Sequence, residues 1–168
     1  MSLKLNLNNN IVSKIINRAL EEDIGFGDVT TETVITENNN CEAIIWSKEE
    51  GIISGLDVAK MVFNNLDPNI SFEYFISDGD KVKKGSTLAK IKGATGSILT
   101  GERVALNFLQ RMSGISTKTR KYVELVKNYD VRIVDTRKTT PGLRILEKYA
   151  VSKGGGHNHR FRLDDAIM

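Results

Sequence analysis

Two adjacent cations, Arg137 and Lys138, directly follow the short apolar segment 131–136. Arginine offers a planar fork of N–H donors that fits a carboxylate or phosphate with two hydrogen bonds, and lysine offers a compact point charge. An adjacent pair therefore suits a ligand with several anionic oxygens. The alternative is an ordinary basic loop in solvent, and the pair alone does not decide between the two.

The wider segment 132–162 is strongly basic. It holds eight Arg or Lys and two His against two acids, Asp135 and Glu147. The eight cations are Arg132, Arg137, Lys138, Arg144, Lys148, Lys153, Arg160 and Arg162. The glycines at 154–156 would let the backbone approach a ligand closely, although a helix end followed by a turn would also use them.

His157 and His159 are two residues apart and invite a metal interpretation. Two histidines without a third ligand nearby are a weak zinc signal, so we expect no metal ligands in this chain. A histidine beside Arg160 fits better as a hydrogen-bond donor or cation for an anionic ligand. The acidic loop 22–32 is another possible metal site, but its glycines and threonines fit a turn and a cap better.

The composition excludes several classes of protein. The net charge is only +3, so the total charge does not demand a nucleic acid or a membrane as partner. One cysteine, Cys41, cannot form an internal disulfide and suggests a reducing compartment. No continuous apolar segment reaches the length of a membrane span or a signal peptide. We expect a soluble, cytoplasmic protein without nucleic-acid or membrane partners.

The hydrophobic periodicity predicts alternating helices and strands around the basic segment. Ser113–Gly114 is expected to end one helix, and Thr140–Pro141 to begin another. The expected elements are a helix over 10–22 capped by the preceding Asn run, two strands joined by a turn within 41–55, a helix over 56–66, two strands within 71–93, helices over 100–113 and 116–128, a strand over 131–136 and a helix over 141–153.

This order predicts an α+β unit up to about residue 100 and then the helix, strand, helix rhythm of a parallel α/β layer or barrel. In parallel α/β folds the loops after the strands carry the binding groups, because helix N-termini there present free N–H donors. Arg137 and Lys138 occupy such a loop.

Three stretches in this order resemble one enzyme family: EEDIGFGDVTTE, GERVALNFLQRMSGIST and VDTRKTTPGLRILEKYAVSKGGGHNHRFRLDDAIM. They are similar to quinolinate phosphoribosyltransferase, also called nicotinate-nucleotide pyrophosphorylase (carboxylating). The resemblance implies α/β plus α+β: an N-terminal open-faced α/β sandwich with a linking helix over 1–115, then the first part of a truncated β/α barrel over 116–168. It also implies a pentosyltransferase that converts quinolinate and phosphoribosyl pyrophosphate to nicotinate mononucleotide, pyrophosphate and carbon dioxide in NAD synthesis.

The family's pattern also implies the site residues. Substrate-binding positions fall on Arg103, Thr136, Arg137, Lys138, His159 and Arg160, of which Lys138 and His159 are expected to be catalytic. The three arginines are expected to clamp the quinolinate carboxylates, and Arg103 is expected to reach across the interface of a homodimer. Mg²⁺ is expected to arrive with the pyrophosphate of the substrate.

The resemblance further implies a chain longer than this one. The family's barrel continues past residue 168, with a second active-site lysine and then a Glu and an Asp. We therefore expect Met168 to lie inside the next barrel strand and the 168-residue chain alone to lack full activity. An unpaired parallel strand would also expose N–H and C=O groups and uncovered apolar faces.

Two other functions remain open. A sister phosphoribosyltransferase, of the nicotinate or molybdenum-transport-associated kind, would act on a monocarboxylate or another substrate and would not need three carboxylate-binding arginines. A polyanion-binding module could use the same basic segment, although that segment has few aromatic residues for base stacking. Steep salt dependence of binding to arbitrary DNA would favour the module.

Overall fold

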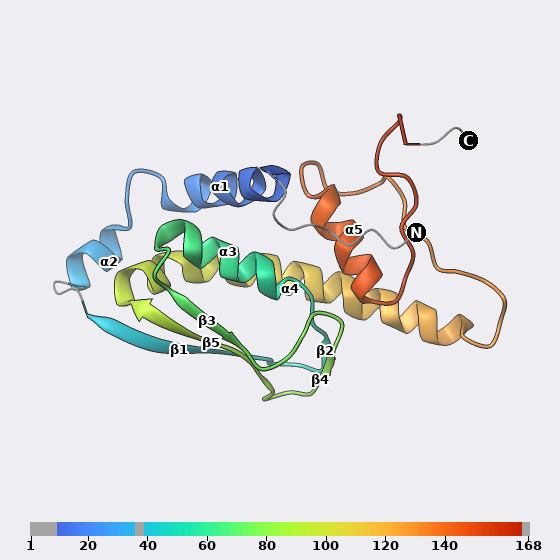
Figure 1. Ribbon diagram of the computed structural model, residues 1–168, viewed down its shortest axis with the longest axis horizontal. Helices are drawn as coiled ribbons and strands as arrows, with labels where there is room; N and C mark the ends of the chain where they lie inside the picture. Colours follow the sequence, from blue (N-terminus) through green and yellow to red (C-terminus); the bar gives the residue numbers. More distant parts are fainter. Residues whose placement is uncertain (1–9, 36–38, 166–168) are drawn as a thin grey trace.

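The computed structural model describes residues 10–35 and 39–165 of the chain (Figure 1). Its elements are α1 (Asn10–Ile24), α2 (Val29–Val34), β1 (Asn40–Trp46), β2 (Gly51–Ile52), α3 (Leu56–Leu66), β3 (Ser71–Tyr74), β4 (Lys81–Val82), β5 (Thr87–Ala94), α4 (Thr95–Val126) and α5 (Arg144–Lys153). None of the helices in the described ranges combines the length and the apolar character of a membrane span.

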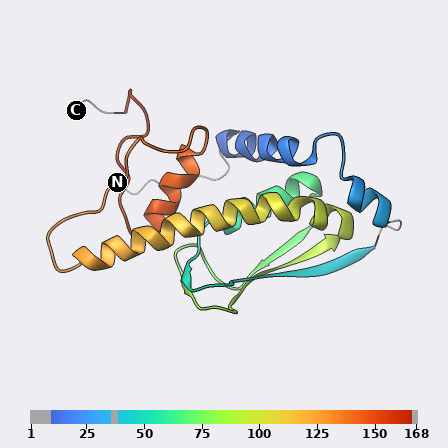
Figure 2. The ribbon, with the colours of Figure 1, turned by 180° about the vertical axis from the view of Figure 1, so that it is seen from behind.

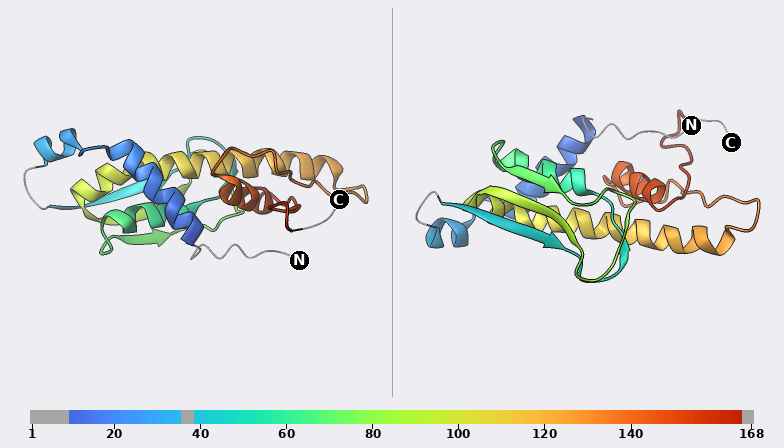
Figure 3. Two further views of the ribbon diagram at one scale, coloured as in Figure 1. Left: turned by 90° about the horizontal axis from the view of Figure 1, so that it is seen from above. Right: turned by 60° about the horizontal axis from the view of Figure 1, so that its bottom comes forward.

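The main sheet has three antiparallel strands in the order β1-β5-β3, and β2 pairs with β4 in a separate two-stranded sheet. Side chains of the three-stranded sheet alternate between its two faces. Ile91 in β5 is buried opposite Phe72 in β3, whereas Glu42 in β1 makes outward ion pairs with Lys90 and Lys92 at 2.7 and 3.2 Å. Figure 3 shows the helices on one side of this sheet. This confirms the mixed α/β class and the open-faced arrangement expected from the sequence.

The strand predictions within 41–55 and 71–93 are confirmed in type, with one difference in pairing. β1 and β2 do not form a hairpin, because β1 pairs with β5 and β2 pairs with the unexpected short strand β4. The core lies between the sheet and the helices and includes Val62, Phe63, Ile91, Val104 and Phe108. The helix over 56–66 is confirmed to the residue.

Helix α4 is 32 residues long and about 48 Å from end to end. Figures 1 and 2 show that its first part lies along the sheet and its last part extends beyond the sheet, where α5 packs on it. The predicted start at Thr100 and end at Ser113–Gly114 are both wrong. The helix begins directly after β5 at Thr95, whose N–H donates to the carbonyl of Asn39.

The helix continues through Ser113 because that side chain has a partner outside α4. The Ser113 hydroxyl accepts a hydrogen bond from the Ser54 N–H at 3.0 Å and donates to the Ser54 carbonyl at 3.2 Å. Met112 and Ser116 are buried on either side, so packing outweighs the weak helix propensity of Gly114. The division of the chain near residue 115 stays a prediction, since one helix runs through it.

The predicted strand over 131–136 does not form among the described residues. Only one parallel bridge is present there, between Val134 and His157. The Asp135 N–H donates to the His157 carbonyl at 3.0 Å, and the His157 N–H donates to the Ile133 carbonyl at 2.9 Å. One neighbouring segment of this length does not support a regular strand. Met168, which is expected to lie inside the next barrel strand, is outside the described residues.

The helix predicted over 141–153 begins three residues late, at Arg144, and ends at Lys153 as expected. Gly142 has a φ of +81°, a left-handed conformation that no α-helix accommodates. The Leu143 N–H instead donates to the Thr140 carbonyl and closes a turn. Thr140 and Pro141 therefore precede the helix without capping it.

The N-terminal helix is confirmed, at Asn10–Ile24, although the Asn run expected to cap it falls mostly outside the described residues. Asp28 in the acidic loop is a structural residue, as expected, and it caps α2 in place of the threonine. It accepts hydrogen bonds from the Thr31 N–H at 3.0 Å and from the Thr100 hydroxyl at 2.9 Å. The Thr31 hydrogen bonds come first in lowering the pKa of Asp28.

Candidate anion-binding site

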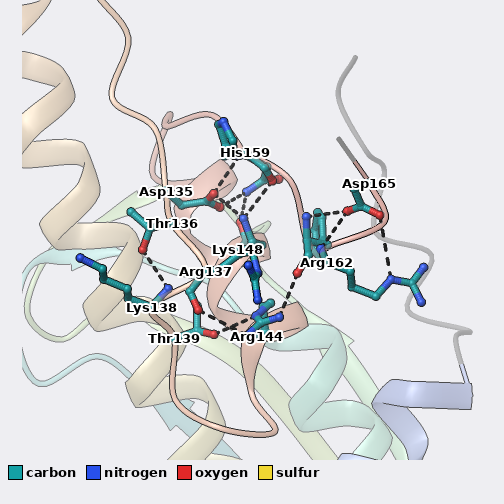
Figure 4. Close-up of polar contacts among 12 residues, drawn as sticks. Asp135, Thr136, Arg137, Lys138, Thr139, Arg144, Lys148, His159, Arg162 and Asp165 are labelled. Atoms are coloured by element: carbon teal, nitrogen blue, oxygen red, sulfur yellow. Dashed lines mark hydrogen bonds and ion pairs between the residues drawn. The ribbon is translucent and has the colours of Figure 1, made fainter. Parts of the chain in front are cut away.

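Two loops lie beside each other at the end of the molecule that carries α5 (Figure 4). The first loop, residues 135–140, precedes α5, and the second loop, residues 154–160, follows it. The bridge between Val134 and His157 joins their bases. Five of the six predicted site residues lie on these two loops.

A buried ion pair holds the loops together. The Lys148 ammonium, on α5, contacts Asp135 Oδ1 at 2.5 Å and donates to the His159 carbonyl at 2.9 Å. The side chains of Lys148 and Asp135 are 0% and 6% exposed. The ammonium also lies 4.9 Å from the centroid of the Phe161 ring. Lys148 therefore links α5 to both loops from within.

The Asp135 carboxylate has two further partners, both on the second loop. Its Oδ1 accepts from the His159 N–H at 2.8 Å, and its Oδ2 accepts from Asn158 Nδ2 at 2.7 Å. Asn158 Nδ2 also donates to the Lys148 carbonyl at 2.7 Å. Because these donors satisfy the carboxylate, Asp135 fixes the second loop and is not a site for a ligand.

Arg144 at the start of α5 makes a second connection. Its Nε donates to the Thr139 hydroxyl at 3.1 Å, its Nη1 to the Phe161 carbonyl at 2.9 Å and its Nη2 to the Arg137 carbonyl at 3.3 Å. Each donor group of this guanidinium thus contacts the backbone or side chain of the loop region. The planar fork of Arg144, which the sequence places only in the basic excess, thus shapes the loops.

Glu147, the second acid of the basic segment, is held by α4. Arg111 of α4 donates to Glu147 Oε1 through Nε at 3.0 Å, and also through Nη2, which contacts the Thr140 hydroxyl as well. The Thr140 N–H donates to Glu147 Oε2 at 3.2 Å. Burial alone would raise the pKa of Glu147, but the hydrogen bonds from Arg111 and Thr140 outweigh it and the pKa is lowered.

The two acids are therefore occupied, and the predicted ligand-binding cations of the first loop have no acidic partner among the described residues. Arg137 Nε is buried without a hydrogen-bond partner. Lys138 is exposed, and Figure 4 shows its side chain pointing away from Lys148. Its backbone N–H donates to the Thr136 hydroxyl at 2.9 Å, which turns the chain between the two residues. The first loop therefore carries positive charge that no acidic side chain of the described residues neutralises.

On the second loop, the backbone of His159 is fixed at both its N–H and its carbonyl, while its side chain is exposed. Arg160 follows it and is half-buried. Arg103 is not brought to this site within one chain. It is exposed on α4, eight residues or about 12 Å along the axis from Arg111.

The structural use of Lys148, Arg144 and Arg111 was not predicted from the sequence. Lys148 and Arg144 belong to the basic excess, yet Asp135 neutralises Lys148 and loop oxygens accept the hydrogen bonds of Arg144. Arg162 also forms ion pairs, with Asp164 and Asp165 at 3.6 and 3.9 Å. One signal was available: Lys148 lies three residues after Ile145 on the apolar side of a short helix, where a lysine needs a buried partner.

A separate cleft of about 610 Å³ lies between α1, α4 and the turn that precedes α5. Its charged residues are Lys14, Arg18, Glu22, Asp23 and Arg111. None of the six predicted site residues lines it. Acids and bases alternate there, so the cleft is a poorer fit for a polyanion than the two loops.

Metal ligation is not favoured by the described residues, which include no group of three or more His, Cys, Asp or Glu that could hold an ion. His157 and His159 have exposed side chains, and their backbones pair with the first loop.

Two basic loops joined by a buried ion pair, with cations on the first loop that have no acidic partner among the described residues, are suited to an anionic ligand. Family models match most of the chain: "Quinolinate phosphoribosyl transferase, N-terminal domain" over residues 28–113 and the C-terminal domain of the same family over residues 115–168. The chain belongs to the quinolinate phosphoribosyl transferase family.

Similar proteins bear related names. A probable nicotinate-nucleotide pyrophosphorylase (carboxylating) of Bacillus subtilis is 48% identical over 157 residues, which are 94% of this chain and 54% of that protein. Quinolinate phosphoribosyltransferase (decarboxylating) 1b of Nicotiana tabacum is 46% identical over 92% of this chain and 44% of that protein. The chain thus spans about half the length of the curated relatives it matches.

Solved structures agree. The nicotinate-nucleotide pyrophosphorylase of Francisella tularensis superposes with a TM-score of 0.88 and 44% identity, over 93% of this chain and 55% of that one. NadC of Streptococcus pyogenes gives a TM-score of 0.90 and 42% identity, over 93% and 56%. The resemblance inferred from the sequence motifs is therefore confirmed at the level of family and fold.

Proposed function

We propose that the protein transfers the phosphoribosyl group of phosphoribosyl pyrophosphate to quinolinate, with loss of carbon dioxide, to give nicotinate mononucleotide and pyrophosphate in NAD synthesis. The observation that carries this proposal is the uncompensated positive charge of the first loop. Arg137 and Lys138 keep uncompensated charge because Asp135 and Glu147 are engaged by Lys148 and Arg111. Both substrates are polyanions, and this charge is suited to them.

In this proposal Arg137 and Arg160 bind the quinolinate carboxylates, and Lys138 and His159 add positive charge beside the reacting atoms. The ring nitrogen attacks C1 of the ribose as pyrophosphate leaves. Loss of carbon dioxide then leaves an electron pair on the ring carbon next to a cationic nitrogen, and that carbon takes up a proton to give nicotinate mononucleotide. Fixed cations stabilise this developing negative charge without reorganising. They also hold two mutually repelling anions in the orientation that the reaction needs.

Arg103 completes the carboxylate clamp from a second copy of the chain in a homodimer. Its exposed position, about 12 Å along α4 from Arg111, supports donation to a neighbour better than use within its own chain. Mg²⁺ accompanies the pyrophosphate of the substrate, and no step relies on metal ligands from this chain. We further propose a cytoplasmic location.

A sister phosphoribosyltransferase is the second candidate, because its substrate would also be anionic. The two differ in the number of carboxylates to be bound. Binding of quinolinate and of the monocarboxylate nicotinate, measured by calorimetry on the same preparation, separates them. We expect quinolinate to bind at least about tenfold more tightly, since a charged hydrogen bond contributes roughly 1.5–3 kcal/mol. Equal or tighter binding of nicotinate would overturn the assignment.

Turnover is the second test. Release of carbon dioxide from carboxyl-labelled quinolinate is measured with and without phosphoribosyl pyrophosphate, and the Bacillus subtilis relative serves as a full-length comparison. We expect release to require both substrates. Release without phosphoribosyl pyrophosphate would contradict the mechanism. Tight, steeply salt-dependent binding of arbitrary DNA would instead support the polyanion-binding module.

A further inference from the structure

We propose that Lys148 is a positioning residue that sets the distance between the two basic loops, and so determines the preference for a dicarboxylate. The proposal rests on the proposed function. Lys148 does not bind substrate itself, because its ammonium is fully buried and its charge is matched by Asp135. It acts through the residues that it holds.

The contacts of Lys148 reach both loops. Through Asp135 it holds the start of the first loop, two residues before Arg137, and through the His159 carbonyl it holds the second loop, one residue before Arg160. Asp135 also accepts the His159 N–H, so His159 is held at both backbone groups. The pair therefore helps to set the separation of Arg137 and Arg160, together with Arg144 and the backbone bridge between the loops.

A stabilising function alone does not explain the pair. Removing two charges from water is costly, and replacement of a buried ion pair by apolar groups of similar volume is often neutral or stabilising. Apolar groups would fill the same volume but would not tie particular atoms of the two loops together. The Lys148 ammonium does so, because it donates to one atom of each loop. A ligand with two carboxylates needs its two arginines at one separation, whereas a monocarboxylate does not.

The test uses a double variant, Lys148→Met with Asp135→Asn, which removes both charges and leaves no buried charge unpaired. The matched control is Lys153→Met, on the same helix, where the ammonium lies over the Tyr149 ring at 5.2 Å and contacts neither loop. Dissociation constants for quinolinate and nicotinate are measured by calorimetry, and folding is checked by thermal denaturation.

We expect the double variant to stay folded and its preference for quinolinate over nicotinate to fall roughly tenfold or more, because small displacements of positioned groups are costly. The control should keep the parent's preference. A folded double variant with the parent's preference would overturn the proposal. A folded variant that loses affinity equally for both ligands would do so too, because a general loss of structure does not discriminate between them.

A second readout does not depend on the ligand. Amide hydrogen exchange at position 135 and at His157 reports the bridge between the loops. We expect exchange there to accelerate roughly tenfold in the double variant while amides within α4 keep their protection. Unchanged exchange would overturn the positioning claim. If the parent protein shows no preference for quinolinate, the proposed function fails, and the exchange result alone decides whether Lys148 positions the loops.

Discussion

Arg137 and Arg144 lie seven residues apart, and their surroundings differ in kind. The donor groups of Arg144 are used by Thr139, Phe161 and the Arg137 carbonyl, whereas Arg137 Nε is buried without a partner. A buried donor without a partner costs free energy that a bound anion would recover. Of these two arginines, Arg137, which follows the strand predicted from the sequence, is therefore the one available to bind a ligand.

Replacement of Arg137 by alanine should weaken quinolinate binding by about 2–5 kcal/mol, because a bidentate charged contact is lost. Arg132→Ala is the matched control: Arg132 is an exposed arginine of the same segment. It should change the binding free energy by less than about 0.5 kcal/mol. Calorimetric titration of both variants is the measurement. Equal losses in the two variants would indicate a general effect of charge.

Protonation of Glu147 in acid should lower the free energy of unfolding of the protein. Hydrogen bonds from Arg111 and Thr140 outweigh burial and lower its pKa below the ordinary value of 4.5. The resulting stabilisation is present above the unfolded pKa and is lost as the pH falls through the lower folded pKa. Glu147→Gln should therefore reduce the pH dependence of the urea midpoint below about pH 4.5. Parallel curves for the variant and the parent would rule out this contribution.

At the scale of elements, α4 shows where local signals mislead. Ser113–Gly114 has the composition of a helix end, but the helix continues because Ser113 bonds to Ser54 and its buried neighbours pack on both sides. Gly142, by contrast, shortens a predicted helix, because its positive φ prevents α5 from beginning before Arg144. Neither the tertiary partner of Ser113 nor the sign of φ at Gly142 can be inferred from periodicity.

Gly114→Ala should stabilise the protein by about 0.5–1 kcal/mol, since alanine restricts the unfolded chain more than glycine does. A Cβ at this position would have no neighbour within 4 Å, so no clash opposes the gain. Equilibrium unfolding in urea measures the change. A destabilised variant would mean that the helix is interrupted at residue 114 in solution.

Gly154→Ala should have the opposite sign. A Cβ at Gly154 would lie 2.5 Å from the Ser116 carbonyl oxygen and 2.6 Å from Thr119 Cβ, both on α4. The φ of −71° is compatible with alanine, so the expected loss of about 1–3 kcal/mol comes from the close approach of α5 to α4. Urea unfolding again gives the value, and Gly114→Ala is the control. An unchanged midpoint would show that the two helices are not in contact at Gly154.

At the scale of the whole molecule, α5 is tied to the sandwich through one carboxylate. The Tyr149 hydroxyl donates to Asp78 Oδ2 at 2.8 Å, and Asp78 also accepts the N–H groups of Gly55 and Leu56 at the start of α3. Burial, and then Asp78, raise the pKa of Tyr149, so its hydroxyl remains a donor. The loops that surround α5 are thereby held in a fixed place relative to the sheet.

The sequence predicted the family, the mixed fold and the type of most elements, because periodicity and a specific motif report on local structure and ancestry. It did not predict which cations of the basic segment are free to bind a ligand. That depends on the partners of Asp135 and Glu147, which lie 13 and 36 residues away in the chain at Lys148 and Arg111. Pairing over such distances is set by the packing of α4 and α5, and no local pattern encodes it.

The most direct test of the central claim is a titration of the isotope-labelled chain with quinolinate, followed by the chemical shifts of its backbone amides. We predict saturable shifts at residues 135–140 and 154–160, with nicotinate producing smaller shifts at the same concentrations. Shifts centred on the cleft between α1 and α4, at Lys14, Arg18 and Arg111, would contradict it.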